Sequence, residues 1–176
     1  LEHAHAIARK YLPDDDTFLD LSTHALAKRQ KAFVKEAMAF ARSTMAYPAD
    51  KDAHPDDKSA KYHAYIDGLG AWDHLPFEKL IEIGKGVCRH QCILEQLALQ
   101  VAGIDSRLAS GAANASSGTF RGLHIWLELS LADNARYLSD QTWNDAIIPL
   151  WSGAYGTDKR RIEMYHRTAR HDGEVV

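Results

Sequence analysis

Apolar residues recur at intervals of three and four along much of the first half of the chain, as they do on the buried face of a helix. Ser22 or Thr23 caps one such segment, and Pro76 opens another. Pro13 and Gly68 end the segments before them. The pattern therefore predicts a helical lead-in. Its helices are expected at residues 1–12, 22–45, 59–68 and 76–83.

Downstream of these helices the period of the pattern changes to two, which is typical of a strand with one buried face. Residues 122–131 alternate His, Trp and Glu with aliphatic side chains. Residues 133–135 then form a turn, so that residues 136–140 return as the second strand of a hairpin. Further strands are expected at residues 106–111 and 162–166. Helices followed by a small antiparallel sheet predict an α+β fold.

The stretch around Cys88 joins two glycines to a new helical pattern. Gly84 and Gly86 precede the cysteine and apolar residues follow it, so we expect a helix that begins at Cys88 and ends at Gly103. Unpaired N–H groups and the helix dipole favour an anion at a helix start. This thiol should therefore lose its proton easily and act as a nucleophile. The alternative is a small buried hydrophobic residue.

His124 and Asp140 complete the set of groups that a thiol nucleophile needs. His124 lies near the start of one predicted strand and Asp140 near the end of the next, so an antiparallel hairpin brings them together. A cysteine, a histidine and an aspartate supply a nucleophile, a base and a group that orients the base. We therefore predict Cys88, His124 and Asp140 as catalytic residues.

Four short motifs give the chain a family resemblance. They are Gly-x-Cys-Arg-His at 86–90, Ala-Gly-Ile-Asp-Ser-Arg-Leu at 102–108, His-x-Trp-x-Glu at 124–128 and Tyr-Leu-x-Asp at 137–140. Together they resemble the transglutaminase-like superfamily of papain-fold cysteine enzymes, over roughly residues 79–144. The resemblance implies a papain-like fold, with the nucleophile helix packed on the sheet. It also implies that Cys88 is the nucleophile, His124 the general base and Asp140 the residue that orients His124.

Residues near the predicted triad are candidates for the substrate and oxyanion region. Trp72 and His74 lie in a loop ahead of the nucleophile helix, where they can line a substrate groove. The alternative is that Trp72 fills the core and His74 lies at the surface. We assign Val87 and Trp126, which flank the nucleophile and the base, to the same region. Residues 111–118 are small and polar, and this loop either covers the site when substrate binds or merely connects two strands.

The 176 residues, of which 45% are hydrophobic, suffice for one domain with a core and are too few for two. We divide this domain (1–176) into a helical lead-in (1–75), a catalytic core (76–145) and a C-terminal extension (146–176). The net charge of −3 indicates no nucleic-acid or membrane partner, and no apolar run approaches the roughly 18 residues of a membrane span. Because the sequence begins with Leu1 rather than Met, we expect a module of a larger chain.

The chain has two cysteines, Cys88 and Cys92, on one predicted helix. A bridge between them would distort that helix, so we expect both thiols to be free. Free thiols suit a reducing, cytoplasmic compartment, either of the producing cell or of a target cell. The ten histidines form no His-Glu-x-x-His spacing and the cysteines no Cys-x-x-Cys spacing, so we predict no metal and no cofactor.

These residues predict acyl transfer on protein or peptide amides through a thioester at Cys88. The resemblance favours glutamine side chains, with an amine as acceptor in transglutamination or water in deamidation. A cysteine protease that cleaves main-chain amides uses the same triad and is the alternative. A further alternative is a catalytically idle domain that binds protein partners, although such a domain has no need to keep all three residues.

Overall fold

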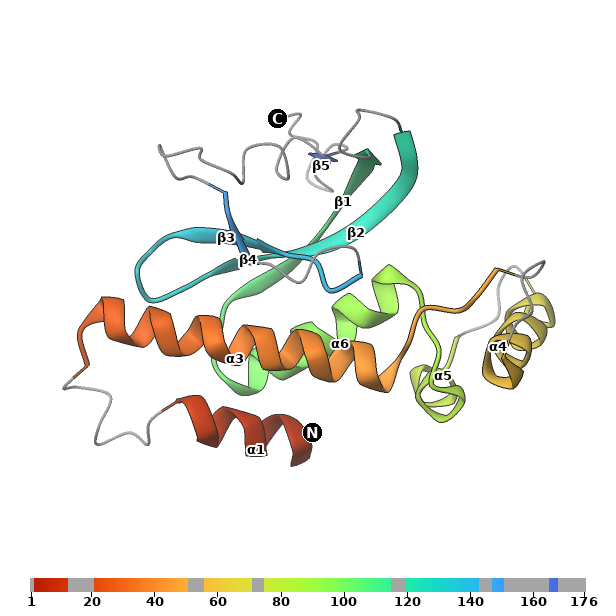
Figure 1. Cartoon of the computed structure of the whole chain (residues 1–176), viewed down its shortest axis with the longest axis horizontal. Helices are drawn as coiled ribbons and strands as arrows, with labels where there is room; N and C mark the ends of the chain where they lie inside the picture. The colour runs from red at the N-terminus through yellow and green to blue at the C-terminus, as the bar shows by residue number, and fades with distance from the viewer. Residues whose placement is uncertain are drawn as a thin grey trace.

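A layer of helices packs against one face of an antiparallel sheet, so the chain has an α+β fold, as predicted (Figure 1). The computed structural model describes residues 2–12, 21–50, 56–70, 75–114, 120–142, 147–150 and 165–167. No helix within those ranges has the length and apolar character needed to cross a bilayer.

The helices of the described residues all fall where the apolar spacing predicts them. They are α1 (Glu2–Tyr11), α3 (Thr23–Thr44), α4 (Asp57–Asp67), α5 (Phe77–Ile83) and α6 (Cys88–Val101). Ser22 caps α3, because its Oγ accepts a hydrogen bond from the N–H of Ala25 at 3.2 Å. Gly103 follows α6 with a φ of +64°, the left-handed conformation that glycine adopts readily, and the chain turns there into the sheet.

Among the residues that the structure describes, five strands form one antiparallel sheet in the order β4–β3–β2–β1–β5. They are β1 (Ser106–Asn114), β2 (Phe120–Ser130), β3 (Arg136–Ser139), β4 (Ile147–Pro149) and β5 (Tyr165–Arg167). The predicted hairpin is formed by β2 and β3, in a register that pairs Leu127 with Ser139. If that register is continued by one residue, Asp140 comes diagonally opposite His124, within reach of a side-chain contact.

The edges of the sheet differ from the prediction. Residues 111–114, which we expected in a loop, extend β1 because their backbone pairs with β2 on one side and, up to Ala113, with β5 on the other. The rest of that loop, residues 115–118, lies outside the described residues. The sequence did not predict β4, since three residues are too few to show an alternation. The strand near the C-terminus is described only over Tyr165–Arg167.

The two longest helices, α3 and α6, form the middle of the helical layer and carry most of its contact with the sheet (Figure 1). Phe33 of α3 and Leu99 of α6 pack with Leu127 and Leu129 of β2, and all four side chains are at most 2% exposed. This core fixes α6 against β2. The start of α6 is thereby held close to the start of the hairpin.

Candidate active site

Cys88 is the first residue of α6, directly after a sharp turn out of α5. Gly84 has a φ of +73°, a left-handed conformation that glycine adopts without strain. At Gly86 the backbone is so close to its neighbours that a Cβ would lie 3.0 Å from the Cβ of His90 and from Sδ of Met45. The two glycines therefore permit the turn that places the thiol at a helix N-terminus.

His90 secures this helix start from the buried side. Its Nδ1 accepts a hydrogen bond from the N–H of Val87, the N-cap residue, at 3.1 Å. Burial, and then the positive charge of Arg89, lower the pKa of His90 to about 4. The ring is therefore neutral at pH 7, and Nδ1 can accept that bond.

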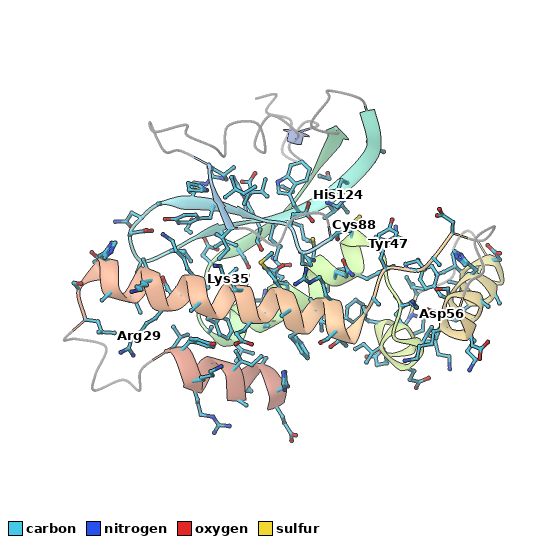
Figure 2. The ribbon with its side chains drawn as sticks, in the orientation of Figure 1. Arg29, Lys35, Tyr47, Asp56, Cys88 and His124 are labelled. Atoms are coloured by element: carbon cyan, nitrogen blue, oxygen red, sulfur yellow. The ribbon has the colours of Figure 1, made fainter. Side chains whose placement is uncertain are left out.

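The structure brings Cys88, His124 and Asp140 together, and Figure 2 shows the first two side by side. Nε2 of His124 lies 2.9 Å from Oδ2 of Asp140, and the two side chains are 1% and 0% exposed. The side chains of Cys88 and His124 also share a hydrogen bond. Because Nε2 bonds Asp140, Nδ1 is the ring nitrogen left for the sulfur. Cys88 keeps partial exposure, which attack on an external substrate requires.

The surroundings favour the charged forms of this pair, a thiolate and an imidazolium. Burial on its own would raise the pKa of Cys88, but hydrogen bonds from His124 and from two backbone N–H groups lower it overall. Those N–H groups belong to Ile125 and Arg89. Burial would likewise lower the pKa of His124, but the hydrogen bonds to Asp140 and Cys88 raise it to about 9. These contacts therefore shift the pair toward the thiolate and the imidazolium before a substrate arrives.

Both thiols are free, but their reactivities should differ widely. Cys92 is 0% exposed, and burial raises the pKa of its thiol well above the ordinary value. Because the thiolate is the reacting form, iodoacetamide should alkylate Cys88 at least about 10²-fold faster than Cys92 at pH 6. Intact mass spectrometry of wild type, Cys88→Ala and Cys92→Ala at graded pH measures both rates. Faster labelling of Cys92 would contradict the assignment of the nucleophile.

Asp140 is held by hydrogen bonds that sequence reasoning missed. Its Oδ1 accepts the N–H of Thr142 at 2.9 Å, and the hydroxyl of Thr142 donates to Oε1 of Gln91 at 2.7 Å. Gln91, on α6, also donates from Nε2 to the carbonyl of Met45 at the end of α3, at 2.7 Å. The orienting carboxylate is thus tied to the helix that carries Cys88 and to the end of α3.

A second buried carboxyl group, Glu95, lies near the triad. Its side chain is 0% exposed, and its Oε1 accepts a hydrogen bond from the hydroxyl of Ser139, the residue before Asp140, at 2.7 Å. Burial raises the pKa of Glu95 to about 8, so the group is a neutral acid at pH 7. It therefore adds no negative charge that would compete with Asp140 for the imidazolium of His124.

Of the four residues assigned to the substrate or oxyanion region, the structure describes Val87 and Trp126. Trp72 and His74 lie outside the described residues, and Val87 is the N-cap directly before the nucleophile. The assignment of Trp126 needs correction, because its side chain is 1% exposed and its ring is closed to substrate. Its ring centre lies 6.4 Å from that of His124, which it supports from the core. The cluster that buries it also contains Ala109, Leu138 and Ile148.

Comparison with known proteins adds no family to this picture. No protein-family model, curated protein or solved structure matches the chain. Within the described ranges, no three His, Cys, Asp or Glu side chains come together as a group that could hold a metal ion. The geometry of Cys88, His124 and Asp140 is the basis for a proposal about function.

Proposed function

We propose that the protein is a cysteine enzyme of papain-like, transglutaminase-like type that transfers acyl groups through a thioester on Cys88. The observation that carries the proposal is the contact of Cys88, at the start of α6, with a histidine whose Nε2 lies 2.9 Å from buried Asp140. A nucleophile, a base and an orienting carboxylate are the parts that covalent acyl transfer needs. The four sequence motifs support the same assignment.

The first half of the reaction forms the thioester. Sγ of Cys88 attacks the carbonyl carbon of an amide, a sulfur–carbon bond forms, and the π electron pair moves onto the carbonyl oxygen. The N–H of Cys88 lies at the helix start and donates to this oxyanion, a contact typically worth about 3 kcal/mol. The electron pair then returns and the carbon–nitrogen bond breaks. The leaving nitrogen takes the proton from Nδ1 of His124 and departs as ammonia or an amine.

The second half releases the acyl group. His124 is now neutral, and it accepts a proton from the attacking water or amine as the thioester breaks down. The thiolate of Cys88 is the leaving group. Asp140 stabilises the imidazolium that results in each cycle and keeps Nδ1 directed at the sulfur.

We assign the side-chain amide of glutamine, in a protein or peptide, as the acyl donor, because the sequence motifs resemble the transglutaminase branch. An amine acceptor gives transglutamination, and water gives deamidation. Cleavage of main-chain amides is the second candidate, since the same three residues serve it. The sulfur of Cys88 must stay reduced in each case, so we propose that the protein acts in a reducing compartment.

An unfolded protein with accessible glutamines tests this function. It is incubated with wild type, Cys88→Ala or Cys92→Ala, with and without a biotinylated primary amine, and ammonia, biotin incorporation and new chain termini are measured. We expect ammonia and biotin incorporation with wild type and with Cys92→Ala, which removes only the other thiol. Cys88→Ala should give neither. New chain termini without ammonia release would favour a protease. No ammonia, no biotin incorporation and no new termini would favour a catalytically idle binding domain.

A further inference from the structure

Tyr47 belongs to the segment between α3 and α4, which runs beside the turn that leads to the nucleophile. The N–H of Ala46 donates to the carbonyl of Gly84 at 3.1 Å, and the N–H of Gly86 donates to the carbonyl of Ala46 at 3.1 Å. These two bonds form a parallel bridge between the segments. Because parallel segments advance in the same direction, Tyr47 comes next to the approach to Cys88.

Hydrogen bonds hold this segment on both sides of Tyr47. Before it, the carbonyl of Met45 accepts the side-chain N–H of Gln91 at 2.7 Å. After it, the N–H of Ala49 donates to Oγ of Ser59, a side chain of α4 that is 0% exposed, at 3.0 Å. The backbone at Tyr47 is therefore fixed relative to α6, and so is the place from which its side chain projects.

The side chain of Tyr47 nevertheless remains open to solvent beside the thiolate. It is 52% exposed, and Figure 2 shows it next to Cys88. Burial, then the negative charge of Cys88 and that of Asp50, raise the pKa of the phenol, so its hydroxyl keeps its proton at neutral pH. None of the residues that the structure describes forms a hydrogen bond with this hydroxyl. It is thus a proton-bearing donor available to a substrate.

We propose that the hydroxyl of Tyr47 is a catalytic donor to the oxyanion, together with the N–H of Cys88; this inference rests on the proposed function. As the sulfur–carbon bond forms and the π pair moves to the carbonyl oxygen, the hydroxyl donates a hydrogen bond to that oxygen and retains its proton. When the pair returns and the carbon–nitrogen bond breaks, the leaving nitrogen takes its proton from His124. A fixed donor at the place where charge develops stabilises the transition state more than the substrate.

p-Nitrophenyl acetate tests the assignment, because it acylates a reactive thiolate through the same oxyanion without needing the natural substrate. Tyr47→Phe removes the hydroxyl and keeps the ring, and Tyr65→Phe on α4 is the matched control. The acylation rate constant should fall about 10²-fold in Tyr47→Phe and stay within about twofold in Tyr65→Phe. Iodoacetamide reacts by displacement at a saturated carbon and forms no oxyanion. Its rate with Cys88 should therefore be unchanged in both variants, which also shows that the site is intact.

The other outcomes separate this inference from the function on which it rests. An unchanged acylation rate in Tyr47→Phe would overturn the assignment of the donor. An equal loss of acylation and alkylation would overturn it as well, since the hydroxyl would then act on the thiolate. A rise in KM alone, with the same rate constant at saturation, would also overturn it, because Tyr47 would then contribute to binding of the ester and not to the transition state. If wild type gives no p-nitrophenolate beyond that of Cys88→Ala, the proposed function itself is wrong.

Discussion

Replacement of His124 with alanine is expected to lower the rate constant of acyl transfer by on the order of 10⁶, the loss typical when one partner of a nucleophile and base pair is removed. The imidazolium, with its pKa raised to about 9, donates to the thiolate of Cys88 and later protonates the leaving nitrogen. Without it, only the N–H groups of Ile125 and Arg89 offset the effect of burial, and the pKa of Cys88 rises. The variant therefore loses both the ionised nucleophile and the acid.

Alkylation at graded pH measures the first of these losses without a substrate. In wild type the rate should rise at a pH below the ordinary pKa of a thiol, and in His124→Ala the rise should move to alkaline pH. Wild-type acyl transfer should be bell-shaped, because it gains from ionisation of Cys88 and declines as His124 loses its proton near pH 9. His5→Ala, an exposed histidine on α1, is the control. If Cys88 of His124→Ala were alkylated at pH 6 as fast as Cys88 of wild type, the assignment of a thiolate and imidazolium pair would be wrong.

The helices and the hairpin were predictable because neighbouring residues determine them. Gly84 and Gly86 interrupt the helical pattern immediately before Cys88, and only such residues allow the close turn observed there. The alternation along β2 and the turn after it set the register of the hairpin. Once the hairpin is antiparallel, the meeting of His124 with Asp140 follows from topology.

The hydrogen bonds that support the site could not be predicted, since they join residues far apart in the sequence. Gln91 bonds Met45, which lies 46 positions before it, and Thr142, which lies 51 positions after it. One signal was present. Gln91 and Glu95 belong to the same buried face of α6 as Cys92, and a polar side chain on an apolar face needs a buried partner. The identity of that partner still required the packed structure.

The exposure of Tyr47 and of Trp126 could not be predicted from the sequence either: Tyr47 is open to solvent, and Trp126 is buried. Tyr47 lies in a stretch that the sequence indicates only as a loop, and its place beside Cys88 depends on the bridge between Ala46 and the turn at residues 84–86. Trp126 has the position in the strand that a site residue would have, yet it is buried in a cluster with side chains from β1, β3 and β4. Exposure at a site is a property of several elements together, so no single stretch reveals it.

Replacement of Asp140 with asparagine is expected to lower the rate constant by on the order of 10⁴, less than the loss of His124. An amide fits the space but mismatches its neighbours in either orientation. If its oxygen accepts the N–H of Thr142, as Oδ1 does now, its NH₂ group meets Nε2 of His124. The ring proton is then confined to Nδ1, and that nitrogen can no longer act as the base toward Cys88. If the amide flips, its NH₂ group faces the N–H of Thr142, and two donors meet in a buried place.

The negative charge of Asp140 matters in addition to its role in orienting the ring of His124. An asparagine removes the carboxylate that raises the pKa of His124, so the pKa of Cys88 should rise in turn. Alkylation by iodoacetamide at pH 6 should therefore slow together with acyl transfer, although Cys88 is unchanged. Urea unfolding checks that the variant folds, and Asp105→Asn, at an exposed carboxylate, is the matched control. A folded Asp140→Asn protein with a wild-type rate constant would contradict this role, because it would mean that His124 is oriented and kept charged without the carboxylate.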